Sequence, residues 1–167
     1  MIISASRRTD IPTYYSQWFI NRIRAGYVYV RNPRNAHQVS RIGLSPETVD
    51  GIVFWTKNPV PMLDKLDALR DYMYYFQFTL NSYGADIEGN LPSKNDVVIP
   101  AFCRLSDAIG PDRVIWRYDP IFLNDTYTVE YHLRQFEAMA SALAGYTSRC
   151  VISFIDLYEK TKRNFPG

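Results

Sequence analysis

Charged and polar side chains follow five apolar runs of this sequence, at the point where each run ends. The cations among them, which suit a carboxylate or a phosphate, are Arg7, Arg8, Lys57 and Arg117. The acids, which would orient those cations or carry protons as catalytic groups, are Asp10, Asp119 and Asp156. The neutral hydrogen-bonding side chains are Gln77, Thr79 and Asn81. Together these residue types predict a binding site for a small molecule with an anionic group.

The five apolar runs are expected to be buried β-strands, because they are rich in Ile, Val and aromatic residues. They cover residues 2–6, 52–56, 74–80, 113–118 and 150–156. Segments with helical spacing separate most of them, which is typical of a mainly parallel sheet with flanking helices. The predicted class is therefore α/β, in which ligands bind beyond the carboxyl ends of the strands.

Helices are expected over residues 12–26, 59–70, 95–109 and 129–144. The first helix has an apolar stripe made of Tyr15, Trp18, Phe19 and Ile23. The last helix has an apolar face made of Leu133, Phe136, Met139 and Leu143. Residues 27–31 and 38–42 are expected to form an inserted hairpin, since Asn-Pro-Arg-Asn separates them. The loop 83–92 is either a lid over the site or a plain connector.

Strand alternation predicts which of these side chains share a face of the sheet. Gln77, Thr79 and Asn81 are expected on one face, and Arg117 and Asp119 project together. Trp116 and Tyr118 then point toward the covering helices. A polar face on a buried strand is costly unless water or a ligand meets it, so these residues are expected at one common rim. The competing interpretation is that Arg117–Asp119 and Arg8–Asp10 are merely local ion pairs and caps.

Positive charge is concentrated near the amino terminus. The net charge of the 167-residue chain is only +2, but the first 50 residues hold seven arginines, no lysine and three acids, a balance of +4. This favours a second hypothesis, a nucleic-acid-binding module that uses these arginines with Trp18, Tyr27 and Tyr29. A third reading is an inactive, truncated remnant. Arginines on solvated surfaces would explain the same composition.

Several familiar sites are excluded by the sequence pattern. The glycines never occur as GxG, and HExxH and GxSxG motifs are absent. No metal site is predicted; His132 is expected to be structural, and Cys103 and Cys150 are expected to be buried apolar residues. Because no apolar stretch approaches the roughly 20 residues of a membrane helix, no membrane partner is expected and a cytoplasmic location is the default.

The longer motifs of the chain occur in a characteristic order. They include Ser4-Ala5-Ser6-Arg7-Arg8-Thr9-Asp10, Phe54-Trp55-Thr56-Lys57-Asn58-Pro59, Val114-Ile115-Trp116-Arg117-Tyr118-Asp119-Pro120 and Ser153-Phe154-Ile155-Asp156. In these motifs the chain resembles a prokaryotic family catalogued as domain of unknown function 1848. The resemblance covers essentially the whole chain and implies a partial, open TIM-like (β/α) barrel. It also implies a radical-SAM-like character, because longer members carry an iron–sulfur type of cysteine cluster near their carboxyl end.

The chain departs from that pattern after Asp156. No cysteine cluster follows, and Cys103 and Cys150 lie 47 positions apart, so no iron–sulfur cluster or S-adenosylmethionine is expected as a cofactor here. We expect residues 1–167 to be a single α/β domain that corresponds to the amino-terminal part of a longer member. The apolar run 150–155 would then be left as an exposed edge strand, which predicts a homodimer through that edge, or a missing remainder.

Overall fold

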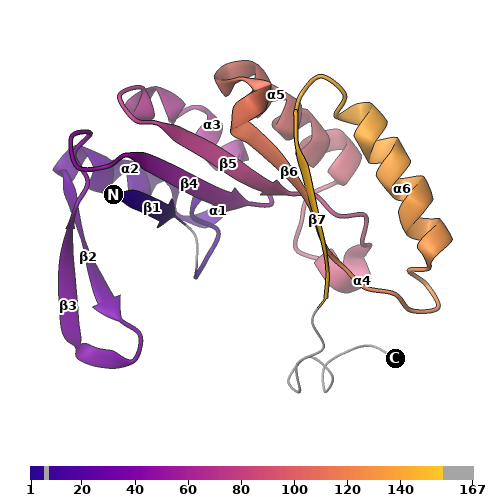
Figure 1. Ribbon diagram of the computed structural model, residues 1–167, viewed down its shortest axis with the longest axis horizontal. Coiled ribbons are helices and arrows are strands. Elements are labelled where there is room, and N and C mark those ends of the chain that lie inside the picture. Colours follow the sequence, from indigo (N-terminus) through magenta and orange to yellow (C-terminus); the bar gives the residue numbers. More distant parts are fainter. Residues whose placement is uncertain (6–7, 156–167) are drawn as a thin grey trace. The chain divides into compact units, whose positions relative to one another are not determined.

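The strands and helices alternate along the chain, as Figure 1 shows for the computed structural model. The structure describes residues 1–5 and 8–155. The five strands of the main sheet lie in the order β1-β4-β5-β6-β7. They are β1 (Ile2–Ala5), β4 (Gly51–Thr56), β5 (Tyr74–Thr79), β6 (Val114–Ile121) and β7 (Cys150–Phe154). Because β1 pairs with β4 and β6 with β7 in parallel, the α/β prediction with a mainly parallel sheet is confirmed.

The helices are mostly short. They are α1 (Ile11–Tyr14), α2 (Ser16–Ala25), α3 (Val60–Leu63), η1 (Leu66–Leu69), α4 (Ala85–Glu88), η2 (Lys94–Val98), α5 (Ile99–Ile109), η3 (Pro111–Arg113) and α6 (Val129–Ala142). No closed barrel is formed by the strands that the structure describes. The chain divides into two compact units, Met1–Gln77 (unit 1) and Phe78–Gly167 (unit 2).

Unit 1 is built on an aromatic core beneath β4. Phe54 is fully buried, stacks on Phe76 with ring centroids 4.8 Å apart, and meets Phe19 of α2 edge-on at 5.2 Å. The predicted stripe of the first helix is therefore partly wrong, since Tyr15 and Trp18 are 50% and 46% exposed. The reason is a break: Tyr15 has non-helical backbone angles, which separate α1 from α2 and shift the buried face.

The predicted helix over 59–70 is also interrupted. It consists of α3 and the single 3₁₀ turn η1, joined through Lys65. After the first turn the chain forms short-range bonds such as Lys65 N–H to the Met62 carbonyl at 2.9 Å, in place of the α-helical bond to residue 61. At the end of α2, by contrast, Gly26 adopts the left-handed conformation (φ 75°) and ends the helix where the sequence predicts.

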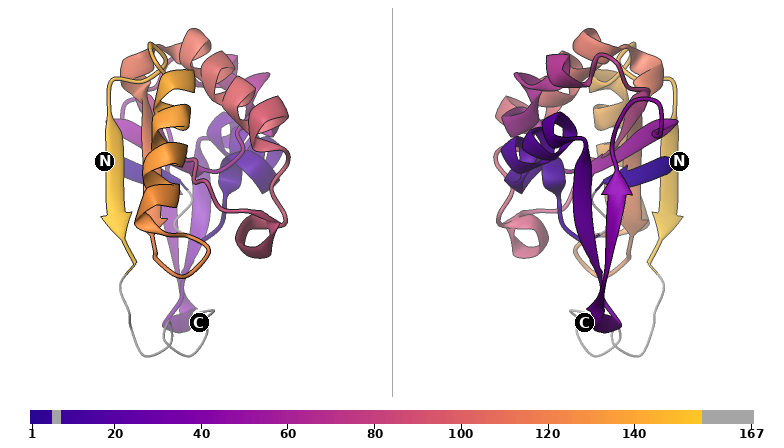
Figure 2. Two further views of the ribbon diagram at one scale, coloured as in Figure 1. Left: turned by 90° about the vertical axis from the view of Figure 1, so that its right-hand side faces the viewer. Right: turned by 90° about the vertical axis from the view of Figure 1, so that its left-hand side faces the viewer.

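The inserted hairpin is confirmed. It consists of β2 (Tyr27–Asn32) and β3 (Asn35–Gly43), which pair with each other in antiparallel fashion and with no other strand of the described chain. Its strands are longer than predicted because pairing continues to Asn32 and Asn35 at the turn. The right-hand panel of Figure 2 shows this two-stranded ribbon extending beyond α2.

Unit 2 packs α5 and α6 against alternate residues of its strands. Phe78 meets Phe102 of α5 with centroids 4.8 Å apart, and Trp116 stacks on Phe136 of α6 at the same separation. Trp116 and Tyr118 are each 2% exposed. The predicted orientation of these two side chains toward the helices is confirmed, so Arg117 and Asp119 occupy the opposite face of β6.

One residue that was predicted on the buried face of α6 is exposed. Met139 and Leu143 are buried, but Leu133 is 65% exposed. His132 is buried instead, because its ring nitrogens bond to the Tyr118 hydroxyl at 2.8 Å and to the Phe122 carbonyl at 3.0 Å. The Ser82 hydroxyl lies 2.8 Å from the same Tyr118 hydroxyl. His132 is thus part of a buried hydrogen-bonded network, as its predicted structural role requires.

Three tyrosines fasten the loop after β5 to the loop after β6. The Tyr83 hydroxyl donates to the Pro120 carbonyl at 2.7 Å and accepts from Phe122 N–H at 3.1 Å. The Tyr127 hydroxyl donates to Asp86 at 2.6 Å and accepts from Gly84 N–H at 3.0 Å, while Tyr131 donates to the Ser82 carbonyl at 2.7 Å.

A partly buried ion pair joins Glu88 of the same loop to Lys94 of η2 at 2.7 Å; their side chains are 5% and 18% exposed. Lys94 also donates to the Tyr83 carbonyl. With this many fixed contacts, the loop 83–92 is a fastened connector rather than a free lid.

Replacing Tyr83 with Phe should lower the free energy of unfolding by about 1–3 kcal/mol, since Pro120 and Phe122 lose their partner. Burial raises the pKa of Tyr83 to about 12. Between pH 10 and about 12 the unfolded tyrosine ionises while the folded one stays protonated, so stability falls as the pH rises through this range. Urea unfolding at a series of pH values checks both effects. Tyr83→Phe should show a shallower alkaline decline than the parent chain, and parallel declines would contradict this account.

Candidate functional site

The predicted site residues divide between the two units. Arg7 and Asp156 lie outside the described residues. Unit 1 contains Arg8, Asp10, Lys57 and Gln77, and unit 2 contains Thr79, Asn81, Arg117 and Asp119. One common rim for all of them therefore stays a prediction.

Asp10 links the carboxyl ends of β1 and β4. Its Oδ1 accepts from Thr13 N–H at 2.9 Å, which caps α1, as expected for an Asp that precedes an early-turn proline. Its Oδ2 accepts from the Thr56 hydroxyl at 3.0 Å and from Lys57 N–H at 2.8 Å. Three donors bind this carboxylate, which therefore holds the segment that directly follows β4 in unit 1.

The cations of unit 1 lie in different surroundings. Lys57 directly follows β4 and is half-buried, with its backbone N–H bonded to Asp10. Arg8 is exposed and its guanidinium lies 3.4 Å from the Arg31 carbonyl of the hairpin. The competing interpretation is confirmed in part at Asp10, which caps α1, but no Arg8–Asp10 ion pair is present among the described residues.

Arg117 and Asp119 form an ion pair on the face of β6 opposite the helices. Arg117 Nε donates to Asp119 Oδ1 at 3.0 Å, and its Nη2 donates to Oδ2. The side chains are 20% and 11% exposed, so the pair is largely desolvated but reachable. Such a two-point contact fixes the plane of the guanidinium.

Neighbouring strands add neutral groups to this ion pair. The Ser153 hydroxyl of β7 lies 3.4 Å from Asp119 Oδ2. Leu80 N–H donates to the Arg117 carbonyl at 3.0 Å, an alignment that places half-buried Thr79 beside Arg117 on the same face. We call Thr79, Arg117, Asp119 and Ser153 the open-face cluster.

The polar residues of β5 only partly follow the predicted alternation. Gln77 and Thr79 share the less buried face of the strand, as expected. Asn81 lies beyond the end of β5 and is 3% exposed, with its amide donating to the Asp119 carbonyl at 2.9 Å. Asn81 therefore holds the carboxyl end of β6 in place, because the strand alternation that predicted its direction stops at Thr79.

Ser153 belongs to the cluster although the sequence reasoning did not select it. It lies in the motif Ser153-Phe154-Ile155-Asp156, and alternation from Asp156 along the strand gives no reason to choose it. The parallel register, which pairs Arg117 with Val151 and Tyr118 with Ile152, is what brings Ser153 beside Asp119.

The two cysteines are poor candidates for nucleophiles or metal ligands. Cys103 is half-buried and Cys150 is exposed, so the prediction that both are buried is wrong. Cys150 is exposed because β7 forms the edge of the sheet. Desolvation raises the pKa of both thiols, with a further contribution from Asp107 at Cys103 and from Asp119 at Cys150. A raised pKa keeps a thiol protonated and unreactive.

The described residues contain neither a cluster of metal ligands nor a helix that could span a membrane. Within residues 1–5 and 8–155, no group of three or more His, Cys, Asp or Glu side chains is arranged to hold a metal ion. In the same part of the chain, no helix has the length and apolarity needed to cross a membrane.

Comparison with known proteins places the chain in a family but assigns it no activity. No curated protein matches the chain, and no solved structure does. A family model described as "Domain of unknown function (DUF1848)" matches residues 2–167, which is essentially the whole sequence. The order of motifs in the sequence is consistent with that match, and the chain belongs to the DUF1848 family.

Proposed function

We propose that unit 2 is the ligand-binding part of an enzyme. Its open-face cluster binds a small molecule by contacting the carboxylate or phosphate group of that molecule. The observation that carries this proposal is the Arg117–Asp119 ion pair, which is largely desolvated and lies on a sheet face that α5 and α6 leave uncovered. It lies in β6, on the approach to the carboxyl end of the strand, where α/β proteins place their ligands.

The energetics favour a binding role over a purely structural one. Desolvating two charges costs free energy that their mutual attraction barely returns, so a strand is stabilised as well by apolar residues at these positions. An arginine whose plane is fixed by one carboxylate loses little further side-chain freedom when it contacts an anionic ligand. Thr79 and Ser153 then supply hydroxyls that set the orientation of the ligand.

In this proposal Asp119 is the acid that orients the cation and accepts protons, and Arg117 is the anion-binding residue. Arg8, Asp10, Lys57 and Gln77 of unit 1 stay predicted site residues, as do Arg7 and Asp156. A radical reaction would take an iron–sulfur cluster on closely spaced thiolates. The two cysteines of this chain do not fit such a cluster, because they lie on α5 and β7 and both thiols have raised pKa values.

Arg117→Gln should weaken anion binding. Calorimetric titration of the full chain with inorganic pyrophosphate and with succinate as probes should show saturable binding of at least one. The variant should weaken that binding by at least tenfold, on the order of one charged hydrogen bond. Arg117→Lys should keep the charge but lose the two-point geometry, so its affinity should lie between those of the parent chain and Arg117→Gln. Arg134→Gln, an exposed arginine on α6, is the control and should bind like the parent. Absence of binding, or equal binding by Arg117→Gln, would refute the proposal.

A second comparison separates binding from stability. Asp119→Asn should lower the free energy of unfolding by about 2 kcal/mol, because it leaves a desolvated guanidinium poorly paired. The double variant Arg117→Met/Asp119→Leu removes both charges and should recover most of that stability while binding no pyrophosphate or succinate. Thermal unfolding and calorimetry measure the two properties. A double variant that stays as unstable as Asp119→Asn would mean that the pair is held for structural reasons.

The exposed edge of the sheet supports a further part of the proposal, a second copy of this chain as partner. β7 ends the strand order, and on its helix-facing side Ile152 and Phe154 are 57% and 67% exposed. Together with Val129 and Leu133 of α6 they line an apolar groove of about 340 Å³. The groove lining contains no Asp, Glu, Lys or Arg. In a two-fold symmetric dimer, the groove of one copy would therefore face the uncharged groove of the other, and the two β7 edges would pair in antiparallel fashion.

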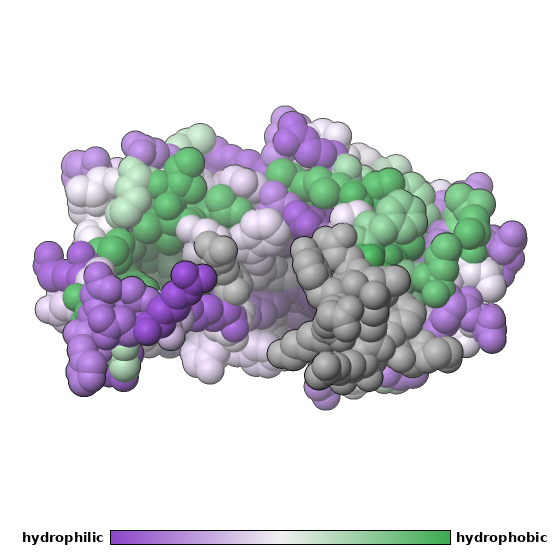
Figure 3. Space-filling model, turned by 60° about the horizontal axis from the view of Figure 1, so that its bottom comes forward, coloured by the Kyte–Doolittle hydropathy of each residue, from purple (hydrophilic) through white to green (hydrophobic). Residues whose placement is uncertain are grey.

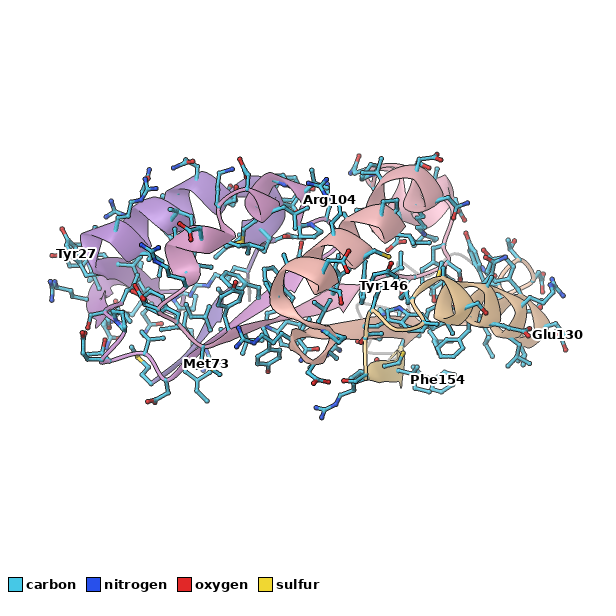
Figure 4. The ribbon with its side chains drawn as sticks, turned by 90° about the horizontal axis from the view of Figure 1, so that it is seen from above. Tyr27, Met73, Arg104, Glu130, Tyr146 and Phe154 are labelled. Carbon is cyan, nitrogen blue, oxygen red and sulfur yellow. The ribbon has the colours of Figure 1, made fainter. Side chains whose placement is uncertain are left out.

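Phe154→Lys should shift the chain toward monomer in sedimentation velocity, because a charge at this position would be desolvated in the pair. Met73→Lys is the matched control, since Met73 is 63% exposed in unit 1 and lies outside the groove. Figure 4 labels both side chains. A parent chain that stays monomeric over the whole concentration range would exclude the second copy and leave the groove to another segment or protein.

A further inference from the structure

The segment between Asp10 and Glu47 contains no acidic residue. Over these 36 positions it holds five arginines and His37, and it covers α1, α2 and the hairpin β2–β3. Arg31, Arg34 and Arg41 of the hairpin are all exposed. Arg8, whose guanidinium lies 3.4 Å from the Arg31 carbonyl, adds a further cation at this place. Figure 3 shows the hairpin at the lower left, with mainly hydrophilic side chains on the face turned to the viewer.

The register of the hairpin sorts its side chains onto two unlike faces. Tyr29 pairs with Arg41 and Arg31 pairs with Val39, so these four and Tyr27 share one face, the Tyr/Arg face. Val28, Val30 and Ile42 share the other face, because Val28 pairs with Ile42 and Val30 with Ser40. The two faces of the hairpin therefore differ in chemistry, one basic and aromatic and the other apolar, and they are suited to different contacts.

The apolar face of the hairpin is directed toward β1 and α2 of unit 1. Val28, Val30 and Ile42 line an apolar cavity of about 300 Å³ together with residues of β1 and α2. This orients the hairpin, and it leaves the Tyr/Arg face directed away from that cavity. Tyr29 is 62% exposed there.

The Tyr/Arg face is ordered by its own contacts. The guanidinium carbon of Arg41 lies 4.5 Å from the centre of the Tyr27 ring, and the Tyr27 and Tyr29 rings meet edge-on with centroids 5.5 Å apart. The two rings therefore contact each other and an arginine on the same face of the ribbon. Figure 4 labels Tyr27 at this end of unit 1.

We infer that the Tyr/Arg face binds single-stranded nucleic acid. Arginines without neighbouring acids neutralise phosphates, and an exposed tyrosine ring offers a stacking platform for an unpaired base. The combination favours a single strand over an acidic peptide, because a peptide of aspartates and glutamates has no flat apolar group to place on Tyr29. Arg31, Arg34 and Arg41 contact the backbone, and Tyr29 stacks on a base. This surface lies in unit 1 and does not depend on the ligand proposed for unit 2.

Fluorescence anisotropy with labelled oligothymidylate and oligouridylate of about 15 nucleotides tests the inference on the full chain. Binding should weaken log-linearly with salt, and Arg31→Gln/Arg41→Gln should reduce the magnitude of that slope by about 1.4, or about 0.7 for each lost phosphate contact. Tyr29→Ala should weaken binding by roughly 5- to 150-fold at fixed salt, whereas Tyr29→Phe should retain it.

Two controls keep the outcome specific to this face. Arg104→Gln, an exposed arginine on α5 labelled in Figure 4, and Tyr14→Ala, a tyrosine that is 66% exposed in α1, should bind like the parent chain. Circular dichroism verifies that each variant is folded. Absence of binding at low salt would overturn the inference. So would equal competition by polyglutamate with no effect of Tyr29→Ala, because that result would identify a general anion surface without base stacking. A preference between the two oligonucleotides would tell DNA from RNA.

Discussion

The alternation of β6 is the constraint on which the candidate site depends. Trp116 and Tyr118 are buried against α6 through Phe136 and His132. Since successive side chains of a strand point to opposite faces, this packing fixes Arg117 and Asp119 on the other face. A one-residue slip of the strand would bury both charges beneath α6, at a cost that the apolar contacts could not offset. The helix packing therefore determines where the charges are presented.

Hydrogen bonds between the loops after β5 and β6 also hold the end of β6 in place. Tyr83, Tyr127 and Tyr131 bridge the segments after β5 and β6 through hydroxyl bonds of 2.6–3.1 Å, and Asn81 bonds to the Asp119 carbonyl. Because these bonds are buried or partly buried, each lost partner leaves a polar group that is at least partly desolvated, which favours a single arrangement. The ion pair is thus supported by neighbours that hold the end of β6, which is the preorganisation that a binding site requires. In unit 1, Asp10 does the same for the ends of β1 and β4.

Much of the architecture could be predicted because its signals are local. Runs of Ile, Val and aromatic residues mark the strands, Gly26 marks the end of α2, and Asn-Pro-Arg-Asn marks the hairpin turn. Local patterns failed where the backbone departed from one regular helix. Tyr15 and Trp18 were expected in the core but are exposed after the break at Tyr15, and the helix predicted over 59–70 is divided into α3 and η1. Leu133 and Cys150 were misjudged for a different reason, since both border a sheet edge that no described segment covers.

The sequence by itself determined the class of fold, the family and the residue types that could bind an anion. It did so because apolar periodicity, turn residues and long motifs are written in consecutive positions. Only the tertiary structure decided which partners those residues have: it joined Ser153 to Asp119, gave the Asp10 carboxylate three donors, and placed both tyrosines and arginines on one face of the hairpin. The physical reason is that strand register and loop closure bring together residues far apart in the chain, and periodicity within one segment carries no information about its neighbour.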